Sequence, residues 1–182
     1  MLVAFAGFGG AGKTTAIEYL EGKHLGRRVY LGESVFDEIK RLGLTRTAEV
    51  EHAVRIDLRS RLGPSAFADL RASSVVELIR NGECVLVDAI FNLAEYRRLL
   101  GCGQDRSVLV SIEASFETRS RRLEARNHRG YSAEQLRLRD QAEVNELGTS
   151  GVLKVAEFTI SNENSLDAFY DDVTAFWKEL SV

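Results

Sequence analysis

The strongest candidate for chemistry is a glycine-rich segment near the amino terminus. Residues 7–14 read GFGGAGKT, which matches the pattern GxxxxGK followed by Ser or Thr at every position. In this pattern, small residues let consecutive backbone N–H groups converge on a phosphate, and the N-terminus of the following helix adds partial positive charge. Lys13 then reaches the β- and γ-phosphates of a nucleoside triphosphate, while the hydroxyl of Thr14 ligates Mg²⁺.

The sequence therefore predicts a site for MgATP, with the choice between ATP and GTP left open. The predicted nucleotide-binding residues of the loop are Gly7, Gly9, Gly10, Ala11, Gly12, Lys13, Thr14 and Thr15.

The segments around this loop alternate between strands and helices. Apolar runs predict five strands, at residues 2–6, 28–31, 84–87, 107–112 and 157–161. Helical spacing of apolar residues predicts helices at 13–20, 33–42, 47–62, 65–80, 115–126, 132–146 and 165–180. Apolar runs without alternation suit parallel strands that are buried on both faces. We therefore expect a three-layer α/β/α fold with a five-stranded parallel sheet and ligands at the carboxyl ends of the strands.

Length and composition narrow the class of protein. The chain has 182 residues, 45% hydrophobic and 28% charged, so we expect a single domain over 1–182. Its net charge of −3 provides no overall positive field for duplex nucleic acid. A basic leader and an apolar run of about 18 residues are both missing, which predicts a cytoplasmic protein without a membrane span. Cys84 and Cys102 are expected to be reduced thiols. Both a monomer and a homodimer are compatible with the sequence.

Charged side chains outside the loop indicate further functional positions. Glu33 comes after the second expected strand, in the sequence Leu-Gly-Glu, and Asp88 comes after the third. Arg119, Arg122 and Arg126 are three and four residues apart, so they share one face of a helix. A carboxylate at the end of a strand and a row of arginines are both typical of sites that handle phosphate.

Together with the loop, these positions resemble the nucleoside monophosphate kinase group of P-loop kinases, most closely its dephospho-CoA-kinase-like branch in archaea and phages. The resemblance runs along nearly the whole chain and implies a P-loop NTPase fold with a small helical lid at about 119–140. It implies that Asp88 binds Mg²⁺ through water, and that Glu33 orients the acceptor hydroxyl or holds metal-bound water. It also implies that Arg122 and Arg126 close over the transferring phosphoryl group.

The same resemblance adds two residues to the nucleotide site. Arg119 is added as a residue of the lid, although Arg122 and Arg126 are preferred over it for contact with phosphate. Asn162 joins it because the segment after the last strand packs along the adenine in this group.

The acceptor site departs from the family pattern. The resemblance assigns the acceptor to helices at about 33–80, where two arginines of the monophosphate kinases hold the acceptor's phosphate. By alignment, Phe36 and Phe91 take their places here, which favours an apolar or planar group. If the alignment is shifted by about one residue, Arg59 is the best source of the missing charge, because the helix at 47–62 should line the acceptor cleft. The other candidates are Arg41, Arg55 and Arg97.

Three functions are compatible with these features. The first is transfer of the γ-phosphoryl group of MgATP to a small nucleotide-type acceptor, such as a nucleoside monophosphate. The second keeps this chemistry but uses an unphosphorylated acceptor: a nucleoside, a dephospho-CoA-like alcohol or a hydroxymethylated base in phage DNA. Nucleic acid is thus expected only as a modified-base substrate. The third is a nucleotide-binding regulator without an acceptor.

Overall fold

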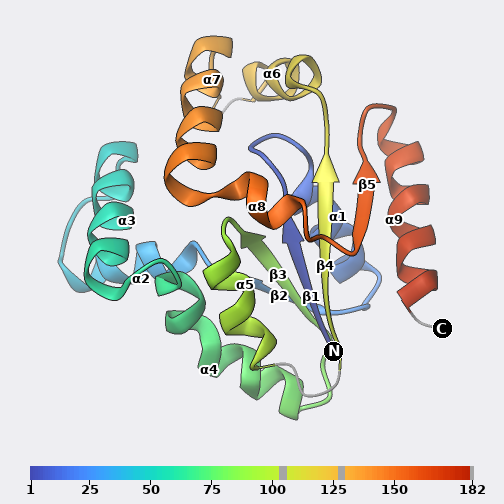
Figure 1. Cartoon of the computed structure of the whole chain (residues 1–182), viewed down its shortest axis with the longest axis horizontal. Helices are drawn as coiled ribbons and strands as arrows, with labels where there is room; N and C mark the ends of the chain where they lie inside the picture. Colours follow the sequence, from blue (N-terminus) through green and yellow to red (C-terminus); the bar gives the residue numbers. More distant parts are fainter. Residues whose placement is uncertain (103–105, 127–129, 181–182) are drawn as a thin grey trace.

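The computed structural model describes residues 1–102, 106–126 and 130–180. In this part of the chain one sheet is formed (Figure 1) by β1 (Leu2–Ala6), β2 (Arg27–Tyr30), β3 (Val85–Ile90), β4 (Ser107–Glu113) and β5 (Phe158–Ser161). The neighbouring strands are parallel, and their order is β2-β3-β1-β4-β5. The predicted five-stranded parallel sheet is confirmed.

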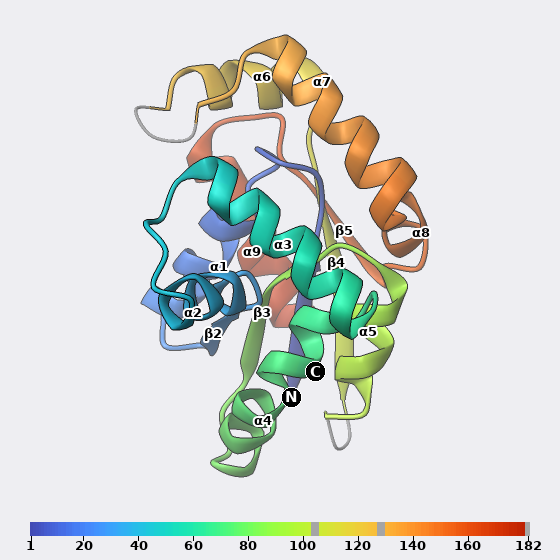
Figure 2. The same cartoon turned by 90° about the vertical axis from the view of Figure 1, so that its left-hand side faces the viewer.

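Helices cover both faces of the sheet, which confirms the three-layer architecture (Figure 2). They are α1 (Lys13–Gly22), α2 (Glu33–Arg41), α3 (Ala48–Leu62), α4 (Ala66–Arg80), α5 (Leu93–Leu100), α6 (Phe116–Glu124), α7 (Ala133–Ala142), α8 (Thr149–Leu153) and α9 (Leu166–Leu180). Alternate side chains of β1 face opposite layers. Leu2, Ala4 and Ala6 pack with α2, α3, α4, α5 and α8, whereas Val3 and Phe5 pack with α1 and α9.

Helices α6 and α7 stand over the carboxyl ends of the central strands, in the position expected of the lid (Figure 1). Each begins with a side-chain cap. Ser115 accepts a hydrogen bond from the N–H of Thr118 at 3.2 Å, and Ser132 forms a capping box with Gln135. Residues 127–129 of the expected lid lie outside the described residues.

Two helices of the structure have no counterpart among the expected elements. Helix α5 is capped by Asn92, whose side chain accepts a hydrogen bond from the N–H of Glu95 at 2.8 Å. Asn and Glu at this spacing are a recognisable start signal, but the eight residues that follow are too few to show a full helical period. Helix α8 is shorter still. It follows a π-helical segment, η1 (Glu143–Leu147), which together with α7 takes the place of the single helix expected at 132–146.

The third strand is longer than the sequence indicates. It was expected to stop before Asp88, but pairing continues to Ile90. The reason is that β3 has a parallel neighbour on each side, so Asp88 pairs with Phe5 of β1 and with Tyr30 of β2. Asp88 therefore lies within the strand and is held by the sheet. No helix in the described residues is long and apolar enough to cross a membrane.

Candidate active site

The turn between β1 and α1 has the backbone that a phosphate-binding loop requires. Gly7 has φ 145° and Gly12 has φ 113°, in a region that residues with side chains rarely adopt. A Cβ atom at Gly7 would lie 2.4 Å from the carbonyl oxygen of Ile112, and one at Gly12 would lie 2.2 Å from Nδ2 of Asn162. Glycine is thus needed at both positions for the loop to pack against β4 and the segment that follows β5.

Lys13 is the first residue of α1, and its ammonium group turns back onto the loop. Nζ donates hydrogen bonds to the carbonyl oxygens of Gly7, at 2.6 Å, and Phe8, at 3.0 Å. Burial lowers the pKa of Lys13 to about 8, although the negative charges of Glu143 and Asp88 partly oppose the shift. The loop therefore holds a poorly hydrated cation where the sequence predicts phosphate.

Thr14 and Asp88 meet beside the loop, as a Mg²⁺ site requires. The hydroxyl of Thr14 donates to Oδ2 of Asp88 at 3.3 Å, and the Asp88 side chain is buried. The same carboxylate oxygen accepts a hydrogen bond from Nη2 of Arg28 at 2.5 Å. Among the described residues, no three His, Cys, Asp or Glu side chains cluster as a metal cage. One hydroxyl and one carboxylate suit Mg²⁺, which usually takes its other ligands from phosphates and water.

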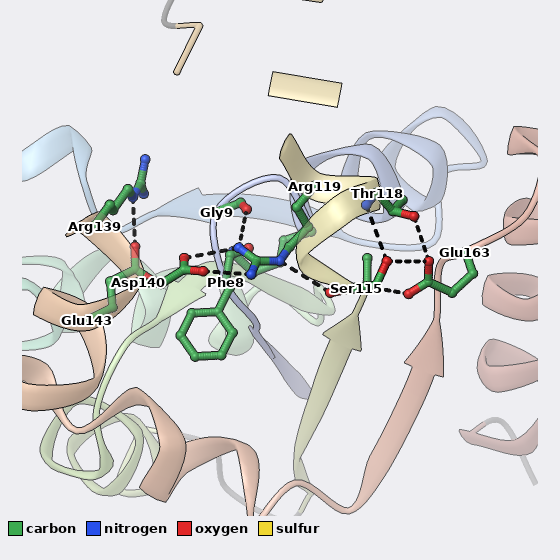
Figure 3. Close-up of polar contacts among 11 residues, drawn as sticks. Phe8, Gly9, Ser115, Thr118, Arg119, Arg139, Asp140, Glu143 and Glu163 are labelled. Carbon is green, nitrogen blue, oxygen red and sulfur yellow. Dashed lines mark hydrogen bonds and ion pairs between the residues drawn. The ribbon is translucent and has the colours of Figure 1, made fainter. Parts of the chain in front are cut away.

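Arg119 links both lid helices to the loop (Figure 3). Its guanidinium makes a bidentate ion pair with Asp140 of α7, with N–O distances of 3.0 and 2.6 Å. It also donates to the carbonyl oxygens of Gly9 and Ala114, each at 3.2 Å. The side chain of Arg119 is only 6% exposed. Of the three arginines predicted to handle phosphate, Arg119 thus touches the loop itself, although it was ranked last.

Arg122 and Asn162 form a second link between the lid and the loop. Arg122 donates to the backbone oxygen of Asn162 at 2.9 Å and to its Oδ1 at 3.1 Å. Nδ2 of Asn162 in turn donates to the carbonyl oxygen of Ala11 at 2.8 Å. Arg126, the remaining predicted arginine, is exposed.

Three arginines from two helices lie near one another beside the loop. Arg55 and Arg59 are on α3, and Arg139 is on α7. The guanidinium of Arg139 lies over the loop, since a Cβ atom at Gly9 would be 3.2 Å from its Cζ. Burial lowers the pKa of Arg55, and the positive charges of Arg59 and Arg139 lower it further.

The three arginines differ in how they are neutralised. Arg59 pairs with Glu95 of α5 at 3.3 Å, and Arg139 pairs with Glu143 at 2.8 Å. Within the described part of the chain, Arg55 has neither a hydrogen bond nor an ion pair through its side chain. Burial raises the pKa of Glu95, so this partner carries its charge less readily than an exposed carboxylate. The negative charge of Glu51, also on α3, acts on Arg55 in the opposite direction to the two arginines.

The other predicted acceptor residues are split between two places. Phe91 is close to the loop, with its ring centre 6.0 Å from Nζ of Lys13. Glu33 and Phe36 belong to α2 instead. The side chain of Glu33 is 58% exposed, and its Oε2 lies 3.7 Å from Nη1 of Arg71. The guanidinium of Arg46 stacks on the ring of Phe36, with its Cζ 3.6 Å from the ring centre.

Charged side chains at the site that were absent from the predicted residues include Arg28, Glu95 and Glu143. Arg28 meets Asp88 only because β2 and β3 are neighbours in the sheet. Glu95 could have been found from the capping pattern that starts α5. For Glu143 no local pattern pointed to the site.

Comparison with curated proteins identifies relatives in archaea. A UPF0200 protein of Methanoregula boonei is 33% identical over 148 residues, covering 80% of this chain and 79% of its own length. The UPF0200 protein MJ1399 of Methanocaldococcus jannaschii is 30% identical, with 92% of this chain and 84% of its own length covered. A UPF0200/UPF0201 protein of Archaeoglobus fulgidus is 32% identical over 94% of this chain, which spans about half (53%) of that relative. No protein-family model matches the chain.

Solved structures with the same fold include small-molecule kinases. A shikimate kinase from Bacteroides thetaiotaomicron aligns with a TM-score of 0.64 and 14% identity over 100% of this chain and 99% of its own. A gluconokinase from Sinorhizobium meliloti aligns with a TM-score of 0.57 and 14% identity, and the alignment covers 98% of this chain and 91% of the gluconokinase. At this identity the likeness establishes the P-loop kinase fold alone. The dephospho-CoA-kinase-like branch, expected from the sequence, is not supported by these neighbours.

Proposed function

The chain belongs to the UPF0200 family, and we propose that it is a kinase that transfers the γ-phosphoryl group of MgATP to a small molecule. The contact between Thr14 and Asp88, beside a loop that holds the ammonium group of Lys13, is the observation that carries this proposal. It provides a metal ligand pair and a phosphate-binding cation on the fold of the P-loop kinases. A bound Mg²⁺ would neutralise charge on the phosphates. A nucleotide-binding regulator is the second candidate, but it would not need the acceptor-side arginines.

Each residue of the site has a distinct role in phosphoryl transfer. The N–H groups of the loop bind phosphate, and Lys13 stabilises the negative charge that develops on the transferring group. Arg119 and Arg122 fix the lid against the loop, which excludes water from the site. Phe91 packs beside Lys13 and contributes to the same exclusion. These roles require no movement of the sheet, whose parallel strands hold Thr14 and Asp88 together.

The cluster of Arg55, Arg59 and Arg139 supports an acceptor with an anionic group. Guanidinium groups that are partly removed from water attract a phosphate or a carboxylate strongly. A nucleoside monophosphate meets this requirement, and so does a small hydroxy acid. The cluster supplies the charge that would otherwise be missing because Phe36 and Phe91 replace two arginines. An uncharged acceptor is correspondingly less well supported.

A screen for phosphoryl transfer tests the proposal. Purified protein and MgATP are combined with ribo- and deoxynucleoside monophosphates, nucleosides, dephospho-CoA, shikimate, gluconate and single-stranded DNA carrying hydroxymethylated bases. Lys13→Ala serves as the blank. We expect ADP release that depends on Lys13 and on one anionic acceptor. Slow hydrolysis that is equal with every compound would contradict the kinase proposal and favour the regulator.

Replacing Arg55 with methionine is expected to weaken acceptor binding. The KM for the acceptor should rise by about 10- to 100-fold, since a charge-assisted hydrogen bond contributes about 1.5–3 kcal/mol. The KM for MgATP should stay within about twofold. Arg41→Met is the matched control, because it removes the same charge from a side chain that is 64% exposed and paired with Glu38. Equal effects of the two substitutions would show that the acceptor lies elsewhere.

The lowered pKa of Lys13 predicts that nucleotide binding takes up protons. In the free protein Lys13 is half deprotonated near pH 8, and phosphates beside it raise its pKa, so the complex holds the proton to higher pH. Affinity for MgATP should therefore fall as the pH rises above about 8, by up to tenfold per pH unit. Calorimetry at pH 8.5 in buffers with different ionisation enthalpies measures the uptake. Lys13→Arg, which stays protonated, should abolish it, and uptake that persists in this variant would assign the proton to another group.

A further inference from the structure

One carboxylate oxygen at the site has no hydrogen-bond donor. Glu143 is 4% exposed and lies at the junction of α7 and η1. Oε1 accepts a hydrogen bond from Nε of Arg139 at 2.8 Å, but Oε2 is buried without a partner in the described part of the chain. Leaving such a group unpaired costs about 1–3 kcal/mol or more, and native proteins rarely do so without a functional reason.

The surroundings of Glu143 place its side chain between the nucleotide side and the proposed acceptor side of the site. On the nucleotide side, the charge of Glu143 is the largest one that raises the pKa of Lys13. On the acceptor side, its partner Arg139 lies over Gly9 and interacts with Arg55. Figure 3 shows Glu143, at the start of η1, beside Arg139 and Asp140 of α7.

The backbone at this point is also unusual. Glu143 is the first residue of η1, whose π-helical hydrogen bonds change the direction in which successive side chains point. Such segments are rare and frequently occur at functional sites. Glu143 itself keeps the helical spacing of α7, four residues after Arg139, so the two side chains lie on one face.

We propose that Oε2 of Glu143 accepts the hydrogen bond, and then the proton, of the acceptor hydroxyl. The inference rests on the proposed kinase function. In the transfer step a bond forms between the acceptor oxygen and the γ-phosphorus while the bond from this phosphorus to the bridging oxygen breaks. The electron pair of the broken bond stays on ADP, and the hydroxyl proton moves to the carboxylate. Oε1 meanwhile keeps Arg139 in place to hold the anionic group of the same acceptor.

This assignment transfers to Glu143 the role that the sequence suggested for Glu33. Glu33 is more than half exposed and its observed partner is Arg71, so its carboxylate is solvated and already has a cation. A carboxylate exposed to water makes only weak, poorly oriented hydrogen bonds to a substrate. A buried carboxylate with a vacant lone pair can hold a hydroxyl group in a fixed position.

Glu143→Gln is the decisive variant. The amide oxygen of glutamine can still accept the hydrogen bond from Arg139, but its NH₂ group cannot take a proton from a hydroxyl. The probes are MgATP with the panel compound that gives the fastest Lys13-dependent ADP release, and MgATP with water. We expect kcat to fall by about 10²- to 10⁴-fold while the Kd for MgATP changes by less than about threefold. Glu33→Gln, the matched control, should change kcat by less than about threefold.

A second variant guards against a folding defect. Glu143→Asp keeps the carboxylate and should recover part of the lost kcat, with a melting temperature close to that of Glu143→Gln. The proposal is overturned if Glu143→Gln turns over as fast as the unmodified protein, or if its kcat and its MgATP affinity fall together. Absence of Lys13-dependent turnover in the unmodified protein would instead refute the kinase function, and this inference with it.

Discussion

Replacing Lys13 with methionine should reduce phosphoryl transfer by about 10³-fold, the scale seen when one donor to a developing negative charge is removed. Lys13 is partly buried against the loop, so its charge acts on a bound phosphate through a medium of lower dielectric constant than water. ADP release in the presence of the best acceptor measures the effect. Lys23→Met is the control, because Lys23 is exposed at the end of the same helix.

The same substitution should not destabilise the fold. The folded protein lowers the pKa of Lys13, so below about pH 8 the charged side chain favours the unfolded state. Methionine removes that cost, and the melting temperature at pH 7 should be unchanged or higher. The gain should shrink as the pH rises above 8 and vanish above the pKa of the unfolded lysine. A clear drop in melting temperature at pH 7 would mean that the hydrogen bonds of Lys13 to the loop outweigh its burial.

Replacing Arg119 with alanine should have the largest effect on stability. The substitution removes both hydrogen bonds to Asp140 and leaves that carboxylate, 18% exposed, without its partner. Breaking one side of a buried ion pair lowers the free energy of unfolding by about 3–5 kcal/mol. Urea denaturation followed by circular dichroism measures the change. Arg119→Lys should restore only part of it, since an ammonium group cannot make the bidentate contact.

A surface pair provides the comparison for this effect. Arg98 and Asp69 also form an ion pair, but both side chains are 41% exposed. Arg98→Ala should therefore cost less than about 1 kcal/mol. If the two alanine variants were equally stable, the contact between Arg119 and Asp140 would contribute nothing beyond an ordinary surface pair, and the lid helices would be held by apolar packing alone.

Sequence alone was enough to predict the loop and the sheet because both depend on contiguous residues. The pattern from Gly7 to Thr14 carries its own geometry, since Gly7, Gly10 and Gly12 adopt positive φ angles that glycine permits. The five strands are visible as apolar runs because a parallel sheet covered on both faces needs no alternation. Even the neighbouring positions of Thr14 and Asp88 follow from the rule that ligands bind at the carboxyl ends of such strands.

The tertiary structure alone decided which charges meet. A helical spacing shows that Arg119 and Arg122 share a face, but not that one pairs with Asp140 and the other with Asn162. Likewise, the arginine cluster forms because α3 and α7, distant in sequence, approach the same loop. Glu143 is buried at the junction of α7 and η1, four residues after its partner Arg139. Electrostatic contacts depend on distance and burial, which local sequence patterns do not encode, and the proposed acceptor site consists almost entirely of such contacts.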